Sequence, residues 1–182
     1  MKEMKLPTDL QKIAKQEFNR IWPEAVDLHK RCLQWSVATK LAWQKLMPDE
    51  RIILQAGTAA WRFAPDSKEG STHFQYYWDE PIAQMRIMEG KTPEWHVWLA
   101  LPDRQMILDP SSGAQVKQML EMIGEVWRPK YALPDFLFAD GMKIDNKDWS
   151  YRPMLSATLH ALECEMQEMR KYAIQTGEVV SW

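Results

Sequence analysis

Cysteine is scarce in this sequence, with Cys32 and Cys164 the only two among 182 residues. Two thiols cannot build a four-thiolate zinc site, and His160 with Cys164 makes at most half of a metal site. Nothing else suggests export, so a structural disulfide is disfavoured. The sequence also contains no phosphate loop, dinucleotide fingerprint or HExxH motif. We therefore expect reduced thiols in a cytoplasmic protein with no metal and no cofactor.

A strong charge of one sign and long apolar runs are also lacking. The formal net charge is -2, with acidic and basic residues interspersed, which argues against nucleic acid and anionic membranes as partners. No apolar run approaches the roughly 18 residues that span a bilayer. Residues 1–11 lack the apolar core of a signal peptide. The sequence leaves the oligomeric state open.

Enough apolar material is present for one folded domain. Hydrophobic residues make up 46% of the chain and charged residues 26%, a balance typical of a globular domain with a real core. We predict one domain spanning residues 1–182. Ten tryptophans are unusual; most should belong to the core, and one or two could instead line a groove.

Hydrophobic periodicity predicts helices first and strands after them. The segment 127–149 is interpreted as loops with one or two short strands, and a final helix should begin at Pro153 and end near Gly177. The predicted fold is α+β, with N-terminal helices packed on an antiparallel meander and a closing C-terminal helix. The predicted helices are 9–21 and 31–46, and the predicted strands are 52–63 (with Gly57 as a candidate bulge), 72–78, 95–101 and 105–109.

Cys32 lies near the predicted start of the second helix, at residue 31. Backbone N–H groups and the helix dipole stabilise a thiolate at such a position, and Lys30 and Arg31 add positive charge. A start as early as Pro23 would instead place Cys32 in the second turn, where the dipole effect is weaker. The plainer interpretation is a small buried apolar residue, which is the commoner role of a helical cysteine.

His96 and Asp109 flank a predicted hairpin. Alternation along the strand 95–101 puts His96 and Trp98 on one face. A histidine among large apolar residues needs partners for its ring nitrogens. Because a short turn joins this strand to the strand 105–109, Asp109 should lie beside His96 and bond one nitrogen. The alternatives are a core histidine bound to a backbone carbonyl and an aspartate that only starts a turn.

Together these residues supply the parts of a thiol acyl-transfer site. A thiolate attacks a carbonyl, an imidazole moves the proton, and a carboxylate orients the imidazole. Cys32, His96 and Asp109 are therefore the candidate catalytic residues.

A helix headed by cysteine, a His-x-Trp strand and an apolar strand ending in Asp-Pro resemble the transglutaminase-like branch of the papain-like cysteine enzymes. The resemblance covers about residues 28–112 and leaves about 113–182 as a C-terminal extension. It implies a papain-like α+β core, with Cys32 as nucleophile, His96 as general base and acid, and Asp109 as orienting residue.

Two departures from that family pattern bear on the oxyanion hole. Trp95 stands where the family more often has glycine or alanine, and His29, Lys30 and Arg31 replace a glycine-rich segment. We expect the backbone N–H of Cys32 to be one donor to the oxyanion.

Three further residues are candidates for substrate binding. Trp98 should share a strand face with His96, and Trp35 lies about one helical turn from Cys32, so both could wall a groove beside the thiol. His73, on the neighbouring predicted strand, could contact substrate. The plainer interpretations are core tryptophans and a surface histidine.

These observations support two hypotheses for the function. The first is a cysteine-dependent enzyme that hydrolyses or transfers an acyl group at an amide, isopeptide or ester bond of a peptide, protein or small substrate. It predicts an accessible Cys32 in a cleft. The second is a catalytically inactive papain-like fold used as a binding or interaction module. It predicts a buried Cys32, or a groove blocked by Trp95, Trp98 or the segment 127–149. The ordered occurrence of all three parts favours the enzyme.

Overall fold

The fold combines helices with one antiparallel sheet. The computed structural model describes residues 6–24, 31–63, 72–76, 88, 95–113, 136–142, 144–145 and 149–178, with the backbone alone at 61–63, 72–76, 144–145 and 149. The main elements of this part are the helices α1 (Leu10–Ile21), α2 (Cys32–Leu46) and α5 (Leu155–Thr176), the 3-10 turn η1 (Pro102–Arg104), and the strands β1 (Ile53–Phe63), β2 (Thr72–Tyr76), β3 (His96–Leu101), β4 (Met106–Asp109), β5 (Leu137–Asp140), β6 (Ile144–Asp145) and β7 (Trp149–Pro153).

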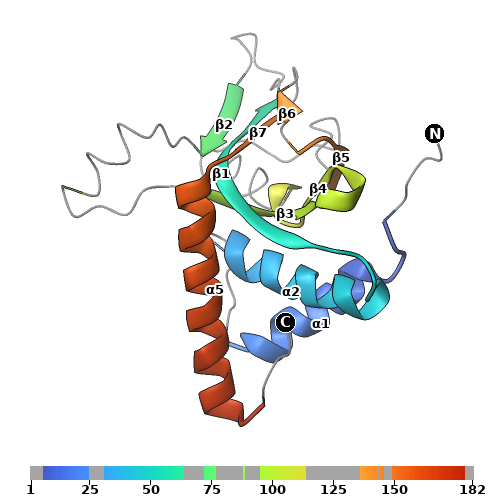
Figure 1. Ribbon diagram of the computed structural model, residues 1–182, viewed down its shortest axis with the longest axis vertical. Helices are drawn as coiled ribbons and strands as arrows, with labels where there is room; N and C mark the ends of the chain where they lie inside the picture. The colour runs from blue at the N-terminus through green and yellow to red at the C-terminus, as the bar shows by residue number, and fades with distance from the viewer. Residues whose placement is uncertain are drawn as a thin grey trace.

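The described strands form one sheet around β1. Its order is β5-β4-β3-β1-β7-β6, β2 also pairs with β1, and all pairs are antiparallel. The first half of β1 pairs with β3, and its second half lies between β7 and β2. Figure 1 shows β1 as a long curved strand that runs from beside the helices to the far end of the sheet.

Gly57 is the point where β1 changes partners. It pairs with His96 of β3 and with Pro153 of β7. A Cβ atom at Gly57 would lie 2.2 Å from the carbonyl oxygen of Arg152, so only glycine lets β7 approach β1 this closely. The strand continues unbroken through Gly57, and the predicted bulge was therefore wrong.

The N-terminal helices pack on one face of the sheet. α1 packs on α2, and α2 lies against β3 and β1 (Figure 1). Phe18 of α1 stacks on Trp35 of α2 with their ring centroids 4.4 Å apart. Alternation along β3 sends Val97 and Leu99 into the apolar core beneath α2. Trp98, between them, faces the other side of the sheet.

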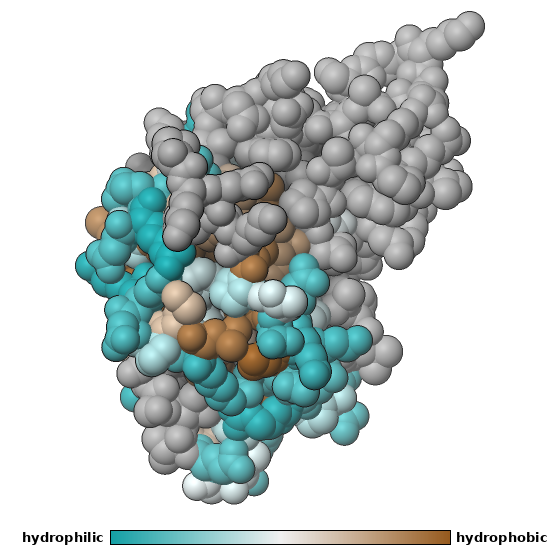
Figure 2. Space-filling view, turned by 90° about the vertical axis from the view of Figure 1, so that its right-hand side faces the viewer, coloured by the Kyte–Doolittle hydropathy of each residue, from teal (hydrophilic) through white to brown (hydrophobic). Residues whose placement is uncertain are grey.

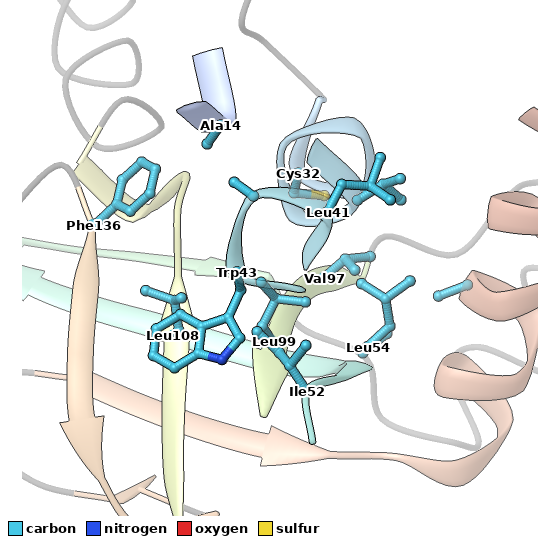
Figure 3. Packing of buried hydrophobic residues seen from close by; sticks show 14 of the residues in the cluster. Ala14, Cys32, Leu41, Trp43, Ile52, Leu54, Val97, Leu99, Leu108 and Phe136 are labelled. Atoms are coloured by element: carbon cyan, nitrogen blue, oxygen red, sulfur yellow. The ribbon is translucent and has the colours of Figure 1, made fainter. Parts of the chain in front are cut away.

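Apolar side chains fill the space between α2 and the sheet. Hydrophilic residues cover much of the described surface in Figure 2, around a small apolar area. Figure 3 shows Trp43, Leu54, Leu99 and Leu108 meeting inside. Trp43 and Trp98 are among the largest fully buried side chains. The interpretation of tryptophan as core material therefore holds for these two residues.

α5 closes the fold against β1 and α2 (Figure 1). The Thr158 hydroxyl accepts the N–H of Ala56 at 3.0 Å and lies 3.2 Å from the Ala56 carbonyl oxygen, to which it can donate. Lys40 of α2 donates to Glu165 of α5 at 2.9 Å, and both side chains are mostly buried. The helix ends at Gly177, which has a left-handed φ of 73°, as predicted.

The predicted α+β class is confirmed, and the predicted elements up to Asp109 agree with the structure within one or two residues. The prediction was wrong at Pro153, which ends β7 rather than beginning the final helix. Within 127–149 the structure has β5, β6 and the first residue of β7, while 127–135 lie outside the described residues. None of the helices in the described part of the chain has the length and hydrophobicity needed to cross a membrane.

Candidate active site

Cys32 is the first residue of α2 and follows Arg31, the N-cap. The first helical hydrogen bond runs from the N–H of Trp35 to the carbonyl of Arg31 at 2.9 Å. The N–H of Cys32 therefore belongs to the first turn, where helix geometry supplies no acceptor and the dipole favours a thiolate. One turn later, the Ser36 hydroxyl donates to the carbonyl of Val97 at 3.2 Å. This bond ties the helix start to β3.

His96 and Asp109 meet across the hairpin. His96 begins β3, Asp109 ends β4, and η1 joins the two strands. The Nε2 atom of His96 lies 2.7 Å from Oδ2 of Asp109, and neither side chain has exposed surface. The structure thus brings together the two residues that the hairpin spacing placed side by side.

The carboxylate of Asp109 accepts further hydrogen bonds. The Tyr151 hydroxyl donates to Oδ2 at 2.6 Å. Oδ1 accepts the backbone N–H of Ser111 at 2.9 Å and the Ser111 hydroxyl at 3.1 Å. Both oxygens are therefore held from two directions, which fixes the plane of the carboxylate and stabilises its charged form.

The surroundings of the pair favour its ionised form. Burial works to lower the pKa of His96, but the charge and hydrogen bond of Asp109, helped by Cys32, raise it to about 10. Burial works to raise the pKa of Asp109, but the charge of His96 and the surrounding hydrogen bonds bring it below its usual value. A buried imidazolium and a buried carboxylate therefore neutralise one another.

Cys32 joins this pair. The side chain of Cys32 lies close enough to His96 to help raise the pKa of His96. Because Nε2 bonds Asp109, Nδ1 is the ring nitrogen that can exchange a proton with the sulfur. Cys32 is only 8% exposed and borders the apolar core (Figure 3). The three predicted catalytic residues lie together, with little of the thiol open to solvent.

The two candidate groove tryptophans have different surroundings. Trp98 is fully buried, and its indole N–H donates to Gln55 at 3.1 Å. Its ring lies 6.2 Å from that of His96, so it belongs to the site but presents no surface to solvent. Trp35 is half-buried and stacks on Phe18 of α1, at the contact between α1 and α2.

The remaining candidate residues, His73 and the pair His160 and Cys164, lie on elements other than those of the Cys32–His96–Asp109 cluster. His73 lies in β2, and its side chain is outside the described residues. On α5, the sulfur of Cys164 is 3.5 Å from Nε2 of His160. Burial first, and then the charges of Glu163 and Glu168, raise the pKa of Cys164. Among the residues that the structure describes, no group of three or more histidines, cysteines or acids could hold a metal.

Two residues of the site were not predicted. Ser111 follows Asp109 by two positions, the spacing at which an aspartate bonds its own turn, so the sequence did contain a signal for it. Tyr151 lies 42 residues from Asp109 on another strand. No local pattern marks such a contact.

The comparisons with known proteins inform the fold alone. No protein-family model and no curated protein matches the chain. Among solved structures, the chain is similar to the crystal structure of genomics APC5867, with a TM-score of 0.54 and 12% identity, over 95% of this chain and 78% of that one. The TM-score supports a similar fold, and identity this low says nothing of a shared activity.

Proposed function

We propose that this protein is a cysteine-dependent enzyme that hydrolyses or transfers acyl groups at amide, isopeptide or ester bonds. The observation that carries the proposal is the buried His96–Asp109 pair, joined to a cysteine at the start of a helix. A purely structural buried histidine could instead be satisfied by backbone carbonyls. An imidazolium placed between a carboxylate and a thiol has the order that nucleophilic thiol catalysis requires.

The chemistry follows from the proton positions. The Cys32 thiolate attacks the substrate carbonyl carbon, and the C–S bond forms as the carbonyl electron pair moves to oxygen. When the intermediate collapses, the imidazolium of His96 gives its proton to the leaving amine or alcohol. The neutral imidazole then takes a proton from water or from an acceptor nucleophile, which attacks the thioester and releases Cys32. Asp109 keeps the ring oriented throughout.

The start of α2 supplies the oxyanion donor in this proposal. The backbone N–H of Cys32 lies in the first helical turn, beside the sulfur that forms the new bond. Negative charge on the carbonyl oxygen would meet this N–H and the positive end of the helix dipole.

The proposal includes membership of the transglutaminase-like branch of the papain-like enzymes. Its support is the cysteine-headed helix packed on an antiparallel sheet, with histidine and aspartate on neighbouring strands. The proposed substrate is a peptide, a protein or a small amide or ester, in the cytoplasm.

Burial of the thiol favours a second candidate function. Cys32 is 8% exposed and Trp98 is fully buried. Trp95 is half-buried, with its ring 4.4 Å from that of His160 on α5. A binding module that kept the fold and lost turnover would have such a closed site. Reactivity of the thiol separates the two functions.

The test is alkylation of Cys32 in a Cys164→Ser background, in which Cys32 is the only thiol that can react. The enzyme hypothesis expects iodoacetamide to modify Cys32 at pH 6 to 7 faster than it modifies a simple thiol such as glutathione, because the imidazolium of His96 maintains a thiolate. His96→Gln should abolish the advantage. If Cys32 is inert in the folded protein, or if it keeps its full reactivity in the His96→Gln variant, the binding module becomes the better function.

A further inference from the structure

Tyr151 approaches the site from a distant part of the chain. It lies on β7, which two strands, β1 and β3, separate from β4 in the sheet order. Tyr151 pairs with Ala59 of β1 and His96 pairs with Gly57, two residues apart, so both side chains share one face of the sheet. The Tyr151 ring is fully buried and reaches across this face to Asp109.

Aromatic packing fixes the direction of the Tyr151 hydroxyl. Its ring meets the Trp98 ring edge-on at 5.3 Å and lies 6.4 Å from the His96 ring. Trp98 is itself held by its bond to Gln55. Phenylalanine would provide the same apolar contacts, so packing explains the ring and leaves the buried hydroxyl to be explained by its acceptor.

The acceptor is the oxygen that His96 also uses. Nε2 of His96 lies 2.7 Å from Oδ2 of Asp109, and the Tyr151 hydroxyl donates to the same atom at 2.6 Å. Ser111 holds the other oxygen twice. A donor on Oδ2 draws negative charge away from the proton of His96, which makes the carboxylate a weaker base towards the imidazole.

We propose that Tyr151 is a positioning residue that acts through Asp109. It fixes the imidazole of His96 and limits how tightly the Asp109 carboxylate holds the proton of His96. This inference rests on the proposed function, because it assigns Tyr151 a part in the same site. A general acid must release its proton, and an imidazolium bound by an undivided carboxylate charge releases it less readily. By donating to Oδ2, the hydroxyl of Tyr151 weakens the hold of the carboxylate on this proton.

The experiment is an NMR titration of the His96 ring in Tyr151→Phe. The variant removes one hydroxyl and keeps the ring against Trp98. We expect the pKa of His96 to rise by about 0.5 to 1 unit, on the order of one hydrogen bond's influence on a neighbouring ionised pair. The matched control is Tyr172→Phe, which removes a buried tyrosine hydroxyl that donates to Glu178, and which should leave the titration of His96 unchanged.

Repeating Tyr151→Phe in an Asp109→Asn background separates positioning from packing. If Tyr151 acts through Asp109, its effect on His96 should disappear there, since coupled residues are not additive. An unchanged titration in Tyr151→Phe, or an equal shift in the Asp109→Asn background, would overturn the inference. The readout does not need a reactive thiol. A shift with an inert Cys32 would therefore keep the positioning role and reject the enzyme.

Discussion

Asp109→Asn is the most informative single change, because the carboxylate is fully enclosed by donors. Oδ2 receives His96 and Tyr151, and Oδ1 receives two bonds from Ser111. An amide has one oxygen and one NH2 group. Whichever way it is oriented, an NH2 group faces donors inside the protein, and the imidazolium loses the negative charge beside it.

The loss of stability in Asp109→Asn depends on pH, and the raised pKa of His96 determines the direction of this dependence. The folded pKa of His96 is raised from 6.5 to about 10, so its stabilising contribution is complete below pH 6.5 and disappears as pH rises through about 10. In Asp109→Asn only burial and Cys32 act strongly on the ring, and we expect the pKa of His96 to fall below 6.5. The difference in free energy of unfolding should therefore be largest near pH 5.5 and should shrink towards pH 9.

Breaking a buried ion pair typically costs about 3 to 5 kcal/mol. For a chain of this length, the melting temperature at pH 5.5 should then fall by roughly 6 to 20 °C. Alkylation of Cys32 should slow as well. A thiol without a cationic partner is a weaker nucleophile near neutral pH, because little of it is ionised. Turnover should fall further, towards the roughly 10⁴-fold loss known for the equivalent change in a serine protease.

The assays are urea denaturation at pH 5.5 and 9 and iodoacetamide kinetics read by peptide mass. Asp103→Asn is the matched control, because Asp103 is exposed in the turn of the same hairpin. If Asp109→Asn behaves like the control, with the melting temperature shifted by a degree or two at both pH values and alkylation of Cys32 unchanged, then Asp109 is merely a turn residue.

Three further predictions concern the second thiol, the tryptophans and the central glycine. Iodoacetamide at neutral pH should modify Cys32 before Cys164, whose pKa is raised; peptide mass analysis showing the reverse order would contradict the assignment of the nucleophile. Trp35→Phe and Trp98→Phe should each slow turnover if these rings line a substrate groove; full thiol reactivity and turnover in both variants, with only a lower melting temperature, would make them scaffold. Gly57→Ala should destabilise the fold by about 2 kcal/mol or more, since the added Cβ would lie 2.2 Å from a β7 carbonyl oxygen; a urea midpoint equal to that of the parent would show that β7 can shift at little cost.

The elements that the sequence predicted well are those with a long local pattern. α1 and α2 are more than ten residues long and carry recurring apolar positions. β1 is a long run rich in β-branched, aromatic and small residues, and the β3–β4 hairpin has a short turn between two apolar strands. Local spacing was therefore enough to bring His96 and Asp109 together. The start of α2 at Cys32 lies one residue from the predicted start at residue 31.

What the sequence did not reveal depends on contacts between distant segments. β7 is five residues long and ends in Pro153, a residue that equally suits the first turn of a helix. Its assignment as a strand depends on pairing with β1, almost a hundred residues earlier. Because β7 was missed, Tyr151 was missed too. The burial of Cys32 is likewise a property of the assembled core rather than of its neighbours in sequence.

The pairing of β7 with β1 has a consequence for the order in which the site matures during synthesis. A growing chain contains Cys32, His96 and Asp109 well before Tyr151 emerges, and pairings between such distant segments form late. Until β7 docks, one side of β1 has no partner along 57–61, and the carboxylate lacks one of its donors. The nascent protein therefore holds the three catalytic candidates without their final alignment. Under the proposed function, the site would therefore reach its final alignment only when the sheet is complete.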